Sequence, residues 1–124
     1  MAKSRLISLN GKVPDNMVFL HGNALQLPFK PGSFGTAISL NLLHALEDVK
    51  TVLHELKNAL NEHGTMHLTT LVKGDRFADL YLSSLGRGGA LVPRGSDQLL
   101  TVFSELEIPT THTLRGNLLF ISSQ

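Results

Sequence analysis

Polar side chains follow two short apolar segments that the sequence pattern predicts to be strands. Met17–Leu20 is followed by the loop Gly22-Asn23-Ala24-Leu25, and Ala37–Leu40 is followed by Asn41-Leu42-Leu43-His44. Ligands of open parallel sheets bind beyond the carboxyl ends of the strands, and an asparagine amide offers both an acceptor and a donor. The two loops therefore suggest a ligand site, although the small residues of the first loop also suit a surface turn that binds nothing.

The elements around these loops follow the order strand, loop, strand, helix, strand, which is typical of a parallel α/β sheet. Both apolar segments lack clean alternation, as expected of strands covered on both faces. The turn residues of Pro28–Ser33 separate them. A helix is predicted next, with Asp48 as its N-cap and Gly64 as its closing residue, and then a strand over Thr65–Val72. The apolar stripe of that helix comprises Val49, Val52, Leu53, Leu56, Ala59 and Leu60.

The stretch HGNALQLPFKPGSFGTAISLNLLHALEDVKTVLHEL resembles the middle of class I S-adenosylmethionine (SAM)-dependent methyltransferases, of the type that includes the ubiquinone and menaquinone C-methylases. Members of this family typically read G-D-A-x-x-L-P-F-x-x-x-S-F-D, followed by a strand and L-H-H-L. The resemblance implies an α/β fold with a partial Rossmann-like sheet, mainly parallel, that ends in an antiparallel hairpin. The strand order of the resembled fold is 3-2-1-4-5-7-6, its cofactor is SAM, and its substrate here is an unknown small molecule.

The resemblance also implies roles for individual residues. Asn23 stands where the family usually has an aspartate that accepts a hydrogen bond from the adenine amino group, and Ala24 and Leu25 would flank the adenine ring. Asn41 and Leu42 would face the methyl donor and the substrate.

His44 is the candidate catalytic residue, through contact with the substrate. A single histidine at a strand end is also often a hydrogen-bonded structural residue. Gly35 stands where the family commonly has an aspartate at the start of the fourth strand. We expect the missing carboxylate to loosen the start of that strand.

A glycine-rich loop should precede this stretch, but no G-x-G occurs before His21 and the only acidic residue there is Asp15. We therefore interpret residues 1–124 as a single methyltransferase-like domain, truncated at its N-terminus. Weak or absent SAM binding is expected, because polar contacts from the missing loop would be lost. The alternative is a non-catalytic interaction or dimerisation module derived from a methyltransferase.

Composition narrows the kinds of partner, the cellular location and the metal sites that the sequence allows. The 124 residues carry a formal net charge of +1 and 17% charged residues, which argues against a nucleic-acid or membrane-surface partner. There is no cysteine and no apolar run near the roughly 20 residues of a membrane span, so a cytoplasmic protein is expected. His63 and His67 are four residues apart, but Gly64 and the strand-like residues after it disfavour a helix there, so no metal site is expected.

The two ends of the chain are less clear. Ser4–Leu9 suits the tail of a helix ending at Asn10-Gly11, or a strand in a hairpin turned by the same two residues. Helices are predicted after Asp75 and after a capping Ser96. Two antiparallel strands are predicted, and they are Thr111–Leu114 and Leu118–Ser122.

Two further expectations concern surfaces. Leu91–Ser96 reads LVPRGS, a thrombin recognition sequence, and its glycine-rich surroundings predict an exposed loop that thrombin cuts after Arg94. Without the first two strands of the resembled fold, Ala37–Leu40 would be an apolar edge. Such edges pair with another strand, which here is a strand of a second copy, a rearranged third strand or the Leu6–Leu9 segment. Among these we expect a homodimer.

Overall fold

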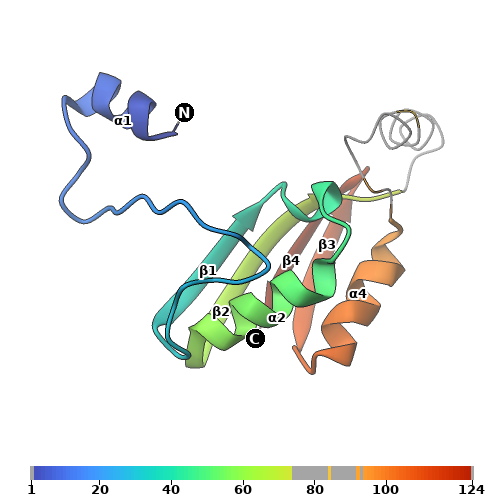
Figure 1. The fold of residues 1–124 in the computed structure, drawn as a ribbon. Helices are drawn as coiled ribbons and strands as arrows, with labels where there is room; N and C mark the ends of the chain where they lie inside the picture. Colours follow the sequence, from blue (N-terminus) through green and yellow to red (C-terminus); the bar gives the residue numbers. More distant parts are fainter. Residues whose placement is uncertain (1, 74–83, 85–91, 93, 124) are drawn as a thin grey trace.

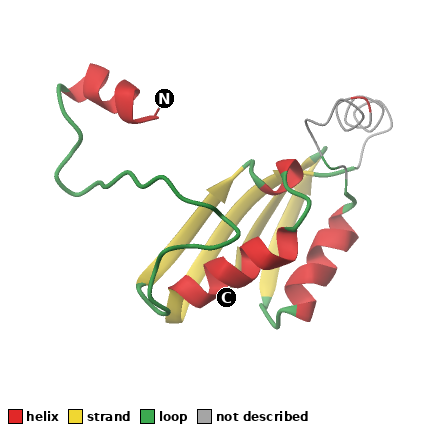
Figure 2. Ribbon diagram, in the orientation of Figure 1, coloured by secondary structure: helices red, strands yellow, loops and turns green. Residues whose placement is uncertain are grey.

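The computed structural model describes residues 2–73, 84, 92 and 94–123. Its main body is one four-stranded sheet with helices packed on one face, and an N-terminal segment stands apart from it (Figures 1 and 2). The sheet order is β1-β2-β4-β3. In chain order the elements are α1 (Ala2–Asn10), β1 (Phe34–Leu40), η1 (Leu43–Ala45), α2 (Val49–Ala59), β2 (Leu60–Leu71), α4 (Ser96–Glu105), β3 (Thr110–Arg115) and β4 (Leu118–Ser123).

The sheet combines one parallel pair with an antiparallel hairpin. β1 runs parallel to β2, β2 pairs antiparallel with β4, and β4 pairs antiparallel with β3. Gly116, with φ of 60°, turns the hairpin between β3 and β4. The order matches the 4-5-7-6 half of the resembled fold, so the α/β class, the Rossmann-like arrangement and the C-terminal hairpin are confirmed. The expectation of a mainly parallel sheet is not met in the described residues, where one of the three strand pairs is parallel and two are antiparallel.

Helix α2 forms as its apolar period predicts. The Asp48 side chain accepts from the backbone N–H of Thr51 at 3.0 Å, which satisfies a donor of the first turn. The end of the helix was predicted wrongly. α2 stops at Ala59, and Gly64 lies inside β2, which begins at Leu60 without an intervening loop.

The core lies between the sheet and the helices α2 and α4, which contact each other on the same face (Figure 1). Phe103 of α4 and Leu53 of α2 are fully buried there, as is Leu43 of η1. Burial of this apolar surface is the main stabilising term of the domain. The remaining buried members of the cluster are Val49, Val52, Met66, Leu68, Val72, Leu99, Ile108, Leu119 and Ile121.

The N-terminal arm, residues 2–22, stands away from the sheet on the β1 side (Figure 1). The helical interpretation of Ser4–Leu9 is confirmed by α1, and the hairpin interpretation is wrong. The strand predicted over Met17–Leu20 is also wrong, because this segment has no strand pairing and its side chains are exposed. A strand needs a neighbour to satisfy its backbone groups, and no described residue provides one.

Helix α4 begins one residue earlier than predicted. Gly95, not Ser96, is the N-cap, and its backbone N–H donates to Oε1 of Gln98 at 2.8 Å. Leu99 and Phe103 are buried, as the apolar pattern predicts. The helix predicted after Asp75 lies outside the described residues. None of the described helices is long and apolar enough to cross a membrane.

Candidate functional site

The carboxyl end of β1 is bent sharply away from the sheet at Asn41. This residue has a φ of 55°, a left-handed conformation that asparagine adopts more readily than most residues. Its backbone N–H donates to the carbonyl of Thr69 at 2.8 Å, and its side-chain oxygen accepts from the Thr69 hydroxyl at 3.2 Å. These bonds to β2 hold the turn, so Leu42 leaves the strand in a fixed direction.

An apolar hollow of about 350 Å³ opens beside this end of β1. The structure brings together Ala24 and Leu42, two of the predicted site residues, across 18 positions of sequence. β1 and α2 supply most of its lining residues. The lining residues are Ala24, Leu27, Ile38, Ser39, Leu40, Leu42, Val52 and Leu56.

The loop that carries Asn23 is held by its own hydrogen bonds and by α2. The side-chain oxygen of Asn23 accepts a hydrogen bond from the N–H of Leu25 at 2.9 Å. The backbone carbonyl of Asn23 accepts one from the N–H of Gln26. The N–H of Leu27 donates to the Glu55 carboxylate of α2 at 2.9 Å. Asn23 and Leu25, the two neighbours of Ala24 in the sequence, are exposed and are not among the residues that line the hollow.

Ser39 is a residue of the hollow that the sequence pattern did not single out. It is buried near the carboxyl end of β1, and its hydroxyl has no hydrogen-bond partner among the described residues. A buried unpaired hydroxyl costs about 1–3 kcal/mol. A lone serine inside an apolar strand, Ala-Ile-Ser-Leu, was the signal available in the sequence.

His44 lies half-buried in η1 with one ring nitrogen already bonded. Nδ1 lies 3.3 Å from the Thr70 hydroxyl and accepts from the backbone N–H of Leu71 at 3.2 Å. Burial lowers the pKa of His44 below its usual value. Since Nδ1 accepts a hydrogen bond from the N–H of Leu71, the neutral ring carries its own proton on Nε2. Nε2 is therefore a hydrogen-bond donor.

The side chain of Arg94 holds η1 and the two residues after it by hydrogen bonds. Its guanidinium donates to the carbonyls of Leu43, Leu46 and Glu47. Its own carbonyl accepts from the N–H of Lys73. The prediction of a freely exposed Arg94 is therefore wrong for its side chain. Most of the surrounding glycine-rich segment lies outside the described residues.

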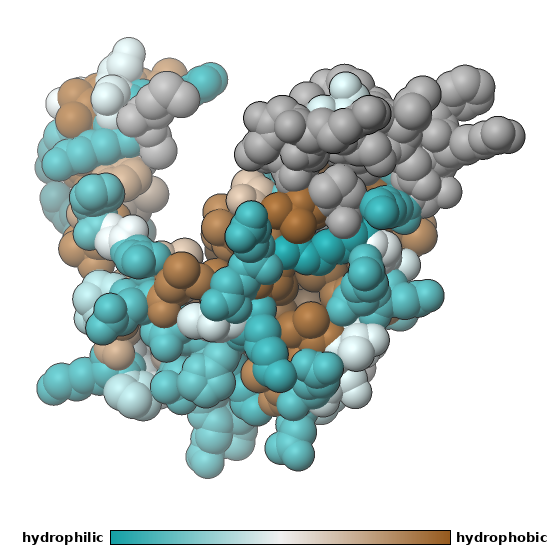
Figure 3. Space-filling view, turned by 45° about the vertical axis from the view of Figure 1, so that its right-hand side comes forward, coloured by the Kyte–Doolittle hydropathy of each residue, from teal (hydrophilic) through white to brown (hydrophobic). Residues whose placement is uncertain are grey.

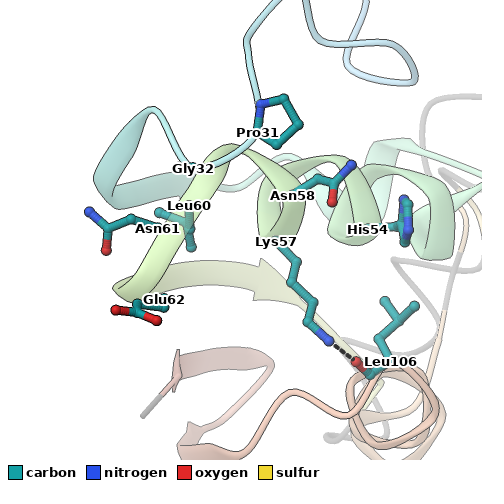
Figure 4. Close-up of a pocket in the computed structure, with 9 residues that line it drawn as sticks. All are labelled: Pro31, Gly32, His54, Lys57, Asn58, Leu60, Asn61, Glu62 and Leu106. Carbon is teal, nitrogen blue, oxygen red and sulfur yellow. Dashed lines mark hydrogen bonds between the residues drawn. The ribbon is translucent and has the colours of Figure 1, made fainter.

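A second hollow, of about 480 Å³, lies at the opposite end of the sheet (Figure 4). It is formed by the end of α2 and the start of β2, at the amino ends of the parallel strands. Its cation, Lys57, already donates to the carbonyl of Leu106 at 2.6 Å. Ligands of open α/β sheets bind at the carboxyl ends, so the hollow beside Leu42 is the better candidate site.

Metal-ligating side chains do not gather in the described part of the chain. No group of three or more His, Cys, Asp or Glu residues is placed there to hold an ion. His63 and His67 lie in β2, where His67 Nδ1 is 3.0 Å from the Ser122 hydroxyl and His63 Nε2 is 3.3 Å from Glu62.

Comparison with known proteins agrees with the fold. A family model described as a methyltransferase domain matches residues 2–68, more than half of the chain. No curated protein matches the chain.

Similar solved structures include several methyltransferases. The YcgJ protein of Bacillus subtilis is 21% identical, with a TM-score of 0.72 over 90% of this chain and 48% of its own. A SAM-dependent methyltransferase of Thermotoga maritima is 15% identical, with a TM-score of 0.69 over 84% of this chain and 62% of its own. A chain from the complex of the Haloferax volcanii Trm112 methyltransferase activator with a candidate methyltransferase is 11% identical, with a TM-score of 0.75 over 94% and 65%. The present chain thus spans less than two thirds of each relative.

Proposed function

The chain belongs to the methyltransferase domain family, and on that premise we propose that it is a SAM-dependent methyltransferase-like domain for a small-molecule substrate. The observation that carries the proposal is the hollow beside β1, which Ala24 and Leu42 both line. This hollow lies at the carboxyl end of a parallel strand, where ligands of α/β sheets bind.

The residues of the hollow fit the adenine side of SAM. Its walls are mostly aliphatic, and its volume of about 350 Å³ lies at the lower end of the range for small-molecule pockets. It suits one planar ring better than a whole cofactor. Asn23 and Asn41 stand at the ends of the two flanking segments, and their amides would supply the polar contacts. When bound, SAM supplies an electrophilic methyl group to the acceptor.

The proposed roles of this chain's residues are mainly binding and orientation. Ala24 and Leu25 would flank the adenine ring, with Asn23 accepting from its amino group while it keeps its bond to Leu25. Leu42 would exclude water from the side of the site that faces the methyl donor. His44 would donate from Nε2 to a substrate oxygen, since its Nδ1 is occupied by Leu71. Placing donor and acceptor in line is the main requirement of a transfer between two bound molecules.

We propose that these 124 residues alone bind SAM weakly. The sequence contains no G-x-G before His21 to bind the methionine part, and an asparagine stands at position 23 in place of the family's aspartate. Loss of two or three hydrogen bonds to charged groups, at about 1.5–3 kcal/mol each, lowers affinity by several orders of magnitude. A dissociation constant weaker than about 10 μM is expected.

A non-catalytic interaction module is the second candidate function. It is favoured by the side chains of β1, where Ile38 and Leu40 are each 67% exposed. Exposed apolar residues of this kind mark interaction surfaces. The proposed partners are a small-molecule substrate, if the domain is active, and a second copy of the chain. The proposed location is the cytoplasm.

Calorimetric titration of SAM into the protein tests the first proposal, with Asn23→Asp as the informative variant. A carboxylate at position 23 can accept from both Leu25 and the adenine amino group, and charge-assisted bonds are stronger. We expect affinity to rise about tenfold. Asn16→Asp adds the same charge on the exposed arm and should leave affinity unchanged. Equal affinity of wild type and Asn23→Asp would contradict the adenine contact.

A further inference from the structure

The turn that carries His44 has few apolar anchors of its own. η1 is a single 3-10 turn of three residues, and Leu43 is the only buried residue between Asn41 and Asp48. Figure 3 shows apolar atoms between the helices and hydrophilic atoms over much of the remaining visible surface. The hydrogen bonds inside a 3-10 turn have poor geometry and stabilise it weakly. The orientation of His44 therefore depends on hydrogen bonds from other segments.

The segment just before α4 binds the backbone of this turn. The guanidinium of Arg94 donates to three backbone carbonyls, those of Leu43, Leu46 and Glu47. The N–H of Val92 donates to the carbonyl of His44 at 2.7 Å. The three carbonyls bound by Arg94 and the one bound by Val92 are four of the five in residues 43–47. A guanidinium suits this arrangement because its five N–H donors lie in one rigid plane.

The ring of His44 is bonded to a different element, the end of β2. Nδ1 accepts from the N–H of Leu71 at 3.2 Å and lies 3.3 Å from the hydroxyl of Thr70, a fully buried residue. The end of β2 is bonded in turn to Arg94, whose carbonyl accepts from the N–H of Lys73 at 2.8 Å. His44 is therefore held by its carbonyl and by its ring, through two segments that are bonded to each other.

These bonds leave Nε2 as the available nitrogen of the ring. The two nitrogens of an imidazole lie on different edges, so Nε2 is directed away from Leu71. No described residue bonds Nε2, and this atom is not fully buried. In a neutral ring whose Nδ1 accepts, Nε2 carries the proton. The ring thus presents one N–H donor in one direction.

We infer that Arg94 is a positioning residue for His44, which it keeps in the Nε2–H tautomer with a fixed ring direction. This inference rests on the donor role proposed above for His44. The carbonyls that Arg94 binds belong to residues on both sides of His44 in the sequence. Without these bonds the turn is free to rotate, Nδ1 separates from Leu71, and both ring nitrogens share the proton. A donor that is fixed before a ligand arrives costs little reorganisation on binding.

The ¹⁵N chemical shifts of the His44 ring test the inference in the protein without SAM. Protonated and accepting ring nitrogens give well-separated signals, and exchange between tautomers averages them. At pH 8 the ring is neutral, because burial lowers the pKa of His44, and wild type should show an accepting Nδ1 and a protonated Nε2. Arg94→Lys should move the two signals toward each other, because an ammonium cannot bridge three carbonyls. Arg115→Lys, at an exposed position, is the matched control and should leave both signals unchanged.

The result for Arg94→Lys separates positioning from stabilisation of the fold alone. A residue that only stabilises the fold would lower the urea midpoint on replacement but leave His44 as a single Nε2–H tautomer. That result would overturn the inference, and so would mixed tautomers in wild type.

A second measurement needs no variant and decides the question if the lysine protein does not fold. Bonds to three carbonyls restrict rotation of the guanidinium, so the two Nη atoms of Arg94 should give separate ¹⁵N signals in wild type. One averaged signal would overturn the inference. Neither readout involves SAM, so failure of this inference is distinct from failure of the proposed function, which the titration of SAM detects.

Discussion

The guanidinium of Arg94 donates a 3.1 Å hydrogen bond to the carbonyl of Leu43, 51 residues earlier in the chain. The same group also donates to the carbonyls of Leu46 and Glu47. Arg94, two residues before the start of α4, is therefore tied to η1, the turn that carries His44. Since Leu42 of the hollow immediately precedes η1, these bonds hold in place the turn beside one wall of the candidate site.

Replacing Arg94 by lysine should destabilise the protein by about 2 kcal/mol or more. Hydrogen bonds to charged groups contribute about 1.5–3 kcal/mol each, and a lysine ammonium cannot span three carbonyls in the plane of a guanidinium. Urea unfolding measures the change. Arg115→Lys at the exposed hairpin turn is the control and should change stability by less than about 0.5 kcal/mol. Equal effects of the two variants would show that the Arg94 bonds contribute little.

Folded protein should resist thrombin at Arg94, although the local sequence is LVPRGS. Cleavage requires a free arginine side chain, and this one is bonded to three carbonyls. Gel electrophoresis after incubation with thrombin should show an intact native chain and a cut chain in urea concentrations that unfold it. Rapid cleavage of the native protein would mean that the Arg94 bonds open readily.

Gly64→Ala should destabilise the protein by about 1–3 kcal/mol. A Cβ atom on Gly64 would lie 2.8 Å from Cβ of Leu60 and 3.0 Å from the carbonyl of Asn61, so the tight start of β2 must shift. Gly35→Ala is the matched control. Its Cβ would approach nothing closer than 3.9 Å, and the loss of glycine entropy should make it neutral or stabilising. Thermal melts of both variants measure the difference, and a neutral Gly64→Ala would refute the close contact.

His44 should make the fold sensitive to mild acid. Burial lowers its folded pKa below the unfolded value of 6.5, so the unfolded chain binds the proton more readily. Stability is therefore full above pH 6.5 and falls as the pH drops through the two pKa values. His44→Asn keeps an acceptor for Leu71 but does not titrate. Urea midpoints at pH 7.5 and 5.5 should differ less for this variant than for wild type, and an identical difference would exclude His44 as the cause.

Local patterns predicted most of the elements. The 3.6-residue apolar period and Asp48 predicted α2, and the turn around Gly116 predicted the C-terminal hairpin. The strand at Met17–Leu20 failed, because strand formation depends on a neighbour that no described residue provides. The prediction that Gly64 ends the helix was also wrong. This glycine lies in β2, where it allows a close approach to Leu60.

The candidate site was only partly predictable. Ala24 and Leu42 were identified from the resemblance, and the structure places both in one hollow. Ser39 and Arg94 were missed as contributors, because burial of a hydroxyl and bonding to carbonyls about 50 residues away depend on tertiary packing. Sequence spacing contains no direct signal for such contacts.

Titration of SAM into isotopically labelled protein, followed by amide chemical shifts, tests the proposed function most directly, because it detects weak binding and locates it. Saturable shifts of Ala24, Ser39 and Leu42, with a dissociation constant weaker than about 10 μM, are the predicted result. Little change is expected at Asn58 and Asn61, which line the opposite hollow. No shifts at millimolar SAM, or shifts confined to that opposite hollow, would contradict a methyltransferase site beside β1 and favour the non-catalytic module.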